Sequence, residues 1–190
     1  MDTTNDARLA AALTALNVVA LYAVLAVLAL AFYFQLSRNE LPCPLCLLQR
    51  IAFTMIAAGL VFNLKFGPRA RGYGLILLGA VFGFATAVRQ VLLHIAPGDP
   101  GYGSPVLGLH YYTWAAIIFA VAILATAVML LFDRPLKMDD APRRLGAAAT
   151  VAIWLALAVT VAEAGSALIE CGFGECPDNP VAYELLPDGL

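Results

Sequence analysis

Five long apolar runs constrain the fold more than any other feature of this 190-residue sequence. A helix needs about 20 apolar residues to cross the hydrocarbon core of a bilayer, and each run reaches that length. Backbone groups have no water partners in lipid, so helices are the default structure there. The runs cover residues 9–34, 46–66, 72–95, 111–132 and 145–169. We therefore predict an all-α, polytopic membrane helix bundle that is surrounded by the lipid bilayer.

The composition favours a membrane protein over a soluble one. Hydrophobic residues make up 62% of the chain and charged residues 13%, whereas a soluble domain is about half apolar and about a quarter charged. A soluble chain of 190 residues has no core large enough to bury so much apolar surface. We expect a single membrane domain over residues 1–190, and the net charge of −2 argues against a nucleic-acid partner.

The first apolar run has two interpretations, a signal peptide or a retained helix. Its apolar part is longer than the core of a signal peptide, which has about 7–15 residues, and no small-residue cleavage site follows it. We expect this run to remain as the first transmembrane helix.

The basic residues predict how the chain is oriented in the membrane. They gather in loops 65–71 and 133–144, as Lys65, Arg69, Arg71, Arg134, Lys137, Arg143 and Arg144. Loop 96–110 and tail 170–190 contain no Lys or Arg. Because cytoplasmic loops carry the excess of basic residues, we expect a cytoplasmic N-terminus. Loop 35–45, loop 96–110 and the tail are then outside.

All four cysteines fall on the side that the charge pattern places outside, as Cys43, Cys46, Cys171 and Cys176. Cysteines in an oxidising outer compartment tend to be paired. We expect the pairs Cys43–Cys46 and Cys171–Cys176, while the sequence alone leaves the other connectivities open.

The stretch Cys43-Pro44-Leu45-Cys46 predicts a reactive thiol pair. It lies at the expected start of the second helix, where unpaired N–H groups and the helix dipole stabilise a thiolate. Pro44 suits the first position of a helix because it needs no N–H partner. A structural disulfide is the alternative, but so small a ring removes little chain entropy. Exchange chemistry is therefore the favoured interpretation.

The second cysteine pair lies in the stretch ECGFGECPDNP, directly after the fifth run. Its glycines predict a flexible loop, and a disulfide in an exposed loop is open to exchange with a soluble partner. A relay to the first pair is one interpretation, and a structural disulfide is the other.

Two polar residues accompany the first pair on the expected second helix. Arg50 follows Cys46 by four residues and so lies on the same helix face, one turn deeper, and Gln49 flanks that face. An arginine at the bilayer centre costs about 2.5–3.5 kcal/mol on insertion scales. Arg50 either extends to the headgroups or acts at the site, where it would stabilise a thiolate or donate to a quinone carbonyl.

Further polar residues lie in the third and fifth runs. Arg89 and Gln90 lie at a depth similar to that of Arg50. The two arginines therefore predict one site between the second and third helices, with His94 about one turn further along. Glu163 is a lone carboxylate in the fifth run, which either pairs with one of these arginines or faces a wet cavity.

The stretch LPCPLCLLQR, at the start of the second run, resembles the signature of the disulfide bond formation protein B (DsbB) family. The resemblance implies a helical bundle in the bacterial inner membrane that reoxidises a DsbA-like periplasmic thiol oxidase. It also implies electron transfer to ubiquinone or menaquinone. Cys43 and Cys46 would be the quinone-proximal pair, and Arg50 the quinone-binding arginine. Gln90 stands where many members have a histidine, for which His94 is a nearby substitute.

The resemblance covers roughly residues 9–132, and the fifth run departs from it. The best-known members have four spans and carry the second cysteine pair between the third and fourth, where loop 96–110 has no cysteine. We therefore predict a four-helix DsbB-like core plus a fifth transmembrane helix, with the relay pair in the periplasmic tail 170–190. The predicted site contains catalytic cysteines and quinone-binding residues but no metal. Its members are Cys43, Cys46, Cys171, Cys176, Arg50, Gln49, Arg89, Gln90 and His94.

Three other functions are alternatives. His94, His110 and the outside cysteines are candidate ligands for haem or zinc. A quinone-linked enzyme of the vitamin K epoxide reductase type also has a Cys-x-x-Cys at a helix end, but the pair before the second span favours the DsbB arrangement. A transporter is disfavoured because no inverted repeat or paired broken helices stand out.

Overall fold

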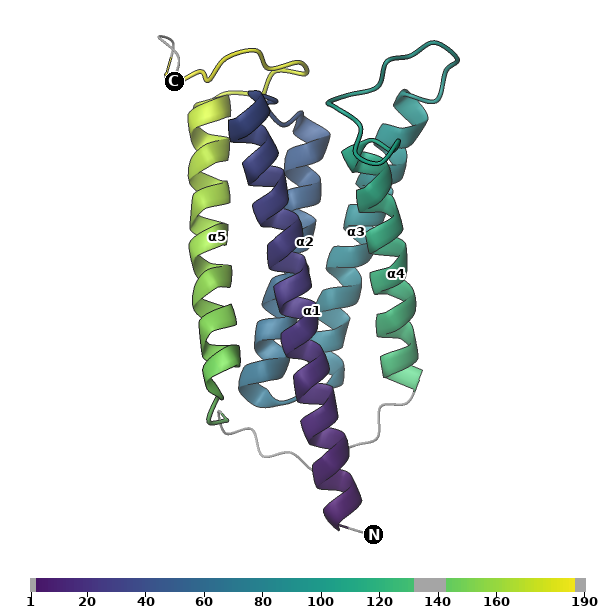
Figure 1. Cartoon of the computed structure of the whole chain (residues 1–190), viewed down its shortest axis with the longest axis vertical. Coiled ribbons are helices and arrows are strands. Elements are labelled where there is room, and N and C mark those ends of the chain that lie inside the picture. The colour runs from purple at the N-terminus through teal and green to yellow at the C-terminus, as the bar shows by residue number, and fades with distance from the viewer. Residues whose placement is uncertain (1–2, 132–142, 187–190) are drawn as a thin grey trace.

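The computed structural model describes residues 3–131 and 143–186, and its fold is a bundle of α-helices (Figure 1). The helices are α1 (Thr3–Arg38), α2 (Pro44–Phe66), α3 (Ala70–Leu93), α4 (Tyr111–Leu131) and α5 (Ala147–Cys171). All five are long and apolar enough to cross a membrane. The described residues contain no strand apart from an isolated bridge between Val106 and Leu109. The predicted all-α, polytopic bundle is confirmed.

The helices α2 and α3 form the centre of the bundle. The helices α1 and α5 pack against α2, while α4 packs against α3. Figure 1 shows α4 and α5 on opposite sides of the bundle. Because α5 also packs against α1, the fifth helix is joined to the core through two neighbours.

Glycine allows α2 and α3 to approach closely. A Cβ atom at Gly59 would lie 2.8 Å from the Gly72 carbonyl oxygen and 2.9 Å from the Ile76 nitrogen. Small residues at such contacts are typical of membrane helices, where close packing replaces the hydrophobic effect between helices. Between α2 and α4, the rings of Phe53 and Phe119 stack with centroids 4.2 Å apart.

The helix α2 starts at Pro44, slightly before the predicted run that begins at residue 46. Pro44 occupies the first turn, and Cys43 caps the helix because its Sγ atom accepts a hydrogen bond from the Cys46 N–H at 3.3 Å. The capped turn places Cys46 in the first turn of α2, one helical turn before Gln49 and Arg50.

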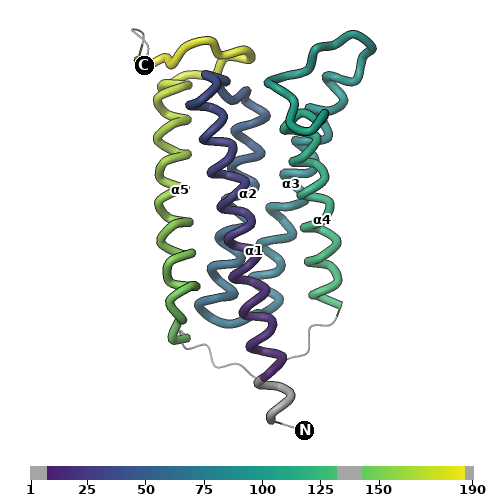
Figure 2. The backbone as a smooth tube through the Cα atoms, in the orientation of Figure 1, coloured from purple at the N-terminus to yellow at the C-terminus, as the bar shows by residue number. Residues whose placement is uncertain are grey.

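The connecting segments divide between the two ends of the bundle (Figure 2). The loop between α1 and α2, loop 94–110 and the residues after α5 share one end, so all four cysteines lie there. At the opposite end, the Arg143 N–H donates to the Lys65 carbonyl at 2.8 Å. Two basic residues used to predict the orientation, Arg134 and Lys137, lie outside the described residues. The orientation across the membrane stays a prediction.

Candidate active site

A cavity of about 310 Å³ lies between α1, α2, α4 and the loop that precedes α4. Its walls are mainly apolar side chains, such as Phe34 and Phe53, while Cys46, Gln49 and Arg50 of α2 add polar groups. Small-molecule sites typically have volumes of about 300–1,000 Å³ and apolar walls with a few polar groups. The cavity therefore has the size and chemistry of a site for an apolar ligand with a small number of polar atoms.

Cys43 and Cys46 are free thiols in this structure, so the disulfide expected between them is not formed. Cys43 is buried, whereas Cys46 is half-buried and lines the cavity. A hydrogen bond with the Cys46 side chain and burial together raise the pKa of the Cys43 thiol. Cys46 is therefore the sulfur of the pair that faces the cavity.

Gln90 of α3 contacts both thiols. Its Nε2 atom donates to Cys43 Sγ at 3.2 Å and to Cys46 Sγ at 3.4 Å. Its Oε1 atom accepts from Gln49 Nε2 at 2.8 Å, and only 1% of the residue is exposed. The structure thus brings the predicted residues Cys43, Cys46, Gln49 and Gln90 together, with Gln90 against the sulfurs rather than on the cavity wall.

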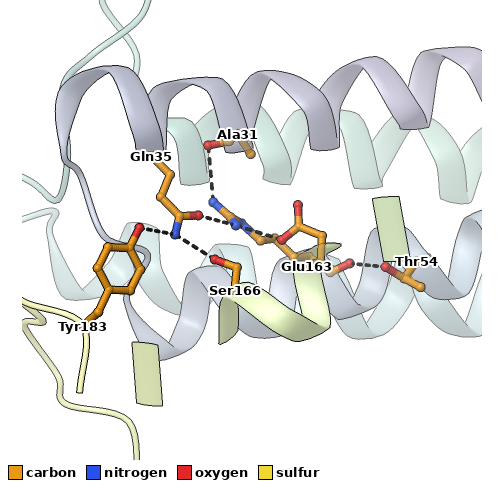
Figure 3. A network of polar contacts seen from close by, with 7 residues as sticks. Ala31, Gln35, Thr54, Glu163, Ser166 and Tyr183 are labelled. Atoms are coloured by element: carbon orange, nitrogen blue, oxygen red, sulfur yellow. Dashed lines mark hydrogen bonds and ion pairs between the residues drawn. The ribbon is translucent and has the colours of Figure 1, made fainter. Parts of the chain in front are cut away.

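Arg50 contributes to a buried polar network that joins α1, α2 and α5. Figure 3 labels its partners Ala31, Gln35 and Glu163. The Arg50 Nη1 atom donates to Gln35 Oε1 and to Glu163 Oε2, both at 2.8 Å. Its Nη2 atom donates to the Ala31 carbonyl at 3.3 Å. Arg50 is 9% exposed and Glu163 is 7% exposed, so the ion pair is buried. Of the two possibilities that the sequence left for Glu163, pairing with an arginine is the one observed.

The same network extends to the tail that follows α5. Gln35 Nε2 donates to Ser166 Oγ at 2.9 Å and to the Tyr183 hydroxyl at 3.2 Å (Figure 3). Backbone hydrogen bonds from residues 184–185 to residues 169–170, at 3.1 and 3.2 Å, fold the tail back over the end of α5. The tail is therefore anchored beside Arg50.

Cys171 and Cys176 form a disulfide, which is the pairing expected from the sequence. Cys171 is the last residue of α5, and Gly172 follows with φ 63°, a left-handed conformation that glycine adopts without strain. The chain leaves the helix at this point, and the disulfide closes a short loop at the same end of the bundle as Cys43.

Arg89 and His94 lie away from the cavity wall. Arg89 is exposed on α3. The Nδ1 atom of His94 lies 3.1 Å from Asp99 Oδ1, and its ring stacks against Tyr112 with centroids 5.6 Å apart. The structure therefore does not bring Arg89 or His94 together with Arg50.

The histidines of the haem or zinc alternative have other partners. The Nδ1 atom of His110 lies 3.1 Å from the Gly103 carbonyl, and its ring stacks against Tyr112 with centroids 5.3 Å apart. Within the described ranges 3–131 and 143–186, no group of three or more His, Cys, Asp or Glu side chains is arranged to hold a metal ion. The alternative has no support in this part of the chain.

Loop 94–110 covers the cavity at the end of the bundle that carries the cysteines. The Tyr102 hydroxyl donates to the Leu41 carbonyl at 2.6 Å, and the Ser104 N–H donates to Glu40 Oε1 at 3.1 Å. Burial and the neighbouring Cys43 raise the pKa of the Tyr102 hydroxyl. Tyr102 and Glu40 both line the cavity, so the loop forms part of its wall.

Sequence reasoning did not single out Gln35, Tyr102 or Tyr183. Gln35 gave a weak signal, because it is a polar residue at the end of a long apolar run. The two tyrosines lie in irregular segments, where no periodicity indicates which side chains turn inward.

A family model described as "Disulfide bond formation protein DsbB" matches residues 13–104. The matched segment includes the Cys43–Cys46 stretch, Arg50 and Gln90, and it ends before α4 and α5. Glu163 and the Cys171–Cys176 disulfide therefore lie outside it.

Several relatives bear the name "Disulfide bond formation protein B". The one from Burkholderia thailandensis is 32% identical over 146 residues, which cover 58% of this chain and 85% of the relative. The one from Burkholderia pseudomallei strain K96243 is 39% identical over 114 residues, or 55% of this chain and 66% of the relative. A third, from Xanthomonas oryzae pv. oryzae, is 40% identical over 77 residues, or 38% of this chain and 45% of the relative. No solved structure matches the chain.

Proposed function

Because the chain belongs to the disulfide bond formation protein B (DsbB) family, we propose that it reoxidises a DsbA-like periplasmic thiol oxidase and transfers the electrons to a membrane quinone. Membership of the family supports the role of a membrane disulfide oxidoreductase. The observation that carries the proposal is the meeting of Cys46, Gln49 and Arg50 at one largely apolar cavity.

The residues of the cavity fit a quinone. Its apolar walls suit a flat ring with an apolar tail. Arg50 and Gln49 line the cavity, and each has N–H groups beyond those already bonded to Gln35, Glu163, Ala31 and Gln90, which a carbonyl oxygen could accept. When bound, ubiquinone or menaquinone would supply a two-electron acceptor that takes two electrons and two protons and leaves as quinol. We do not extend the proposal to Arg89 and His94, since neither lines the cavity.

In this proposal, electrons enter at the tail. A thiolate of the reduced partner attacks the Cys171–Cys176 disulfide and forms a mixed disulfide. The partner's second thiol resolves it, so the partner leaves oxidised and Cys171 and Cys176 become a dithiol. That dithiol then reduces a Cys43–Cys46 disulfide through a second mixed disulfide. Each exchange reduces one disulfide for each one that it forms.

Cys43 and Cys46, the inner pair, then give up two electrons and two protons and become a disulfide again. Cys46 would react first because it faces the cavity, and Cys43 would resolve it. Gln90 donates to both sulfurs and would stabilise the negative charge on the sulfur that loses its proton.

We place the protein in the bacterial inner membrane, with a cytoplasmic N-terminus and periplasmic cysteines. The five apolar helices support a multi-pass protein. The orientation is supported by Lys65 and Arg143, which lie at the end of the bundle opposite the cysteines, because cytoplasmic loops carry the excess of basic residues.

The experiment that tests this function is quinone reduction by the purified full chain in detergent. A reduced DsbA-like protein serves as the donor, short-chain ubiquinone and menaquinone analogues are offered separately, and the loss of quinone absorbance is followed. We expect turnover with at least one quinone and none in Cys46→Ser. Full turnover by Cys46→Ser, or none by the unmodified chain with either quinone, would contradict the proposal.

A second donor separates the two cysteine pairs. With a small dithiol that can reach the inner pair directly, we expect Cys171→Ser and Cys176→Ser to keep their turnover. With the DsbA-like donor, we expect both variants to lose it. If both variants keep their turnover with the DsbA-like donor as well, the tail disulfide has no relay role and its role is structural.

A further inference from the structure

Glu163 lies on α5, outside the segment that the family model matches, yet it contacts the arginine proposed to hold the quinone. Its Oε2 atom lies 2.8 Å from Arg50 Nη1. Its other oxygen, Oε1, is buried and has no hydrogen-bond partner among the described residues. The carboxylate is therefore committed to Arg50 alone in this part of the chain.

Among the described residues, the hydrogen-bond contact between Glu163 and the cavity wall runs through Arg50. Arg50 lines the cavity, whereas Glu163 does not. Of the hydrogen-bond partners of Arg50 within the described residues, Gln35 and the Ala31 carbonyl are neutral, and Glu163 carries the opposite charge. A buried guanidinium without such a partner is strongly unfavourable. Glu163 thus offsets the charge of Arg50 and holds it from the side of α5.

We propose that Glu163 is a positioning residue of the quinone site, which fixes the Arg50 guanidinium at the cavity wall and balances its charge between turnovers. This inference rests on the proposed function. A quinone held at Arg50 would gain negative charge on its oxygen during reduction, and the guanidinium that would stabilise this charge also binds Glu163. The fifth helix is then part of the electron-accepting site and not only the carrier of the tail disulfide.

The test is a double-mutant cycle on the KM for quinone, with the small dithiol as donor so that the tail is bypassed. We expect Glu163→Gln to raise the KM about tenfold, the size expected for the loss of one charge-assisted hydrogen bond. We expect Glu163→Asp, which keeps the charge, to stay within about threefold of the unmodified chain. In an Arg50→Gln background, Glu163→Gln should add no further increase, because its effect passes through Arg50.

Two results would overturn the inference. One is an unchanged KM in Glu163→Gln. The other is a rise in KM that persists fully in the Arg50→Gln background, since Glu163 would then act independently of Arg50. The matched control is Glu184→Gln, which makes the same substitution at an exposed position in the tail.

Two further measurements separate this inference from a structural role and from the proposed function. Exchange between the DsbA-like protein and the Cys171–Cys176 disulfide, measured without quinone, should be unchanged in Glu163→Gln, and a parallel loss of that exchange would assign Glu163 to general folding. If Glu163→Gln fails to fold, the cycle is run with Glu163→Asp, and a rise in KM that persists in the Arg50→Gln background would overturn the inference in the same way. If the unmodified chain reduces neither quinone, the proposed function fails first. If the unmodified chain reduces a quinone and Glu163→Gln keeps the same KM, this inference alone fails.

Discussion

Arg50 and Glu163 join α2 to α5 through a buried ion pair with an N–O distance of 2.8 Å. A buried ion pair gives little net stability compared with a well-packed apolar pair, yet the loss of one partner leaves a charge without compensation. The pair therefore makes the stability of the bundle sensitive to single substitutions at these two positions and tolerant of a matched double substitution.

The first prediction concerns this asymmetry. We expect Glu163→Leu and Arg50→Met each to lower the free energy of unfolding by about 3–5 kcal/mol, because each leaves one buried charge unpaired. The double variant should recover most of that loss. Chemical unfolding in detergent, followed by helical circular dichroism, measures the three changes. Losses that simply add in the double variant would show that the two charges do not interact.

The second prediction concerns Gln90 and the thiols. Gln90→Leu removes the N–H donor that lies 3.2 and 3.4 Å from the two sulfurs. A hydrogen bond to a charged group contributes about 1.5–3 kcal/mol, so we expect alkylation of the inner pair at neutral pH to slow about tenfold or more. Cys171 and Cys176 do not interfere while they are joined as a disulfide.

Mass spectrometry of the alkylated chain gives the rate for the inner pair. The control is Leu92→Ala, at a position on the same helix that is 61% exposed. Equal rates in Gln90→Leu and in the unmodified chain would mean that the amide does not stabilise the thiolate.

The third prediction concerns the contact between α2 and α3. Gly59→Ala places a methyl group 2.8 Å from the Gly72 carbonyl oxygen, and a backbone atom cannot move aside without separating the helices. We expect a loss of about 1–3 kcal/mol in unfolding free energy. Gly74→Ala is the matched control, since its Cβ would meet nothing within 4 Å, and alanine favours a helix over glycine by up to about 1 kcal/mol. If both variants lose stability alike, the effect does not come from the helix contact.

The fourth prediction concerns the anchor of the tail. Tyr183→Phe removes the hydroxyl that accepts from Gln35, while Gln35 keeps its bond to Ser166. The loss of one hydrogen bond is worth about 0.5–1.5 kcal/mol, so residues 172–186 should exchange their amide hydrogens about two- to tenfold faster. Hydrogen exchange read by mass spectrometry tests this, with Tyr33→Phe at an exposed position of α1 as the control. Unchanged exchange would show that the backbone bonds at residues 184–185 hold the tail by themselves.

The five helices could be predicted from the sequence because the bilayer demands long apolar segments, and that demand is visible in composition alone. The start of α2 could also be predicted, since Pro44 and the two cysteines are local signals that act within one turn. The relation of Cys46 to Arg50 followed from helical periodicity, which places residues four apart on one face.

The partners of these residues could not be predicted in the same way. Arg89 lies at a depth similar to that of Arg50, but depth does not define the direction in which a side chain leaves its helix, and Arg89 is exposed. Glu163 and Gln35 meet Arg50 only because α1, α2 and α5 pack with those faces together. Tyr183 comes from an irregular tail, whose path depends on the finished bundle.

The ion pair also has a consequence for how the chain is made. Glu163 lies 113 residues after Arg50. At about 5–20 residues per second, a ribosome needs roughly 6 to 23 seconds to reach the carboxylate after the arginine has been added. The Ala31 carbonyl and the Gln35 amide precede Arg50 and are already present during that interval. Of the described hydrogen-bond partners of Arg50, only these neutral groups therefore exist in the chain until α5 is made.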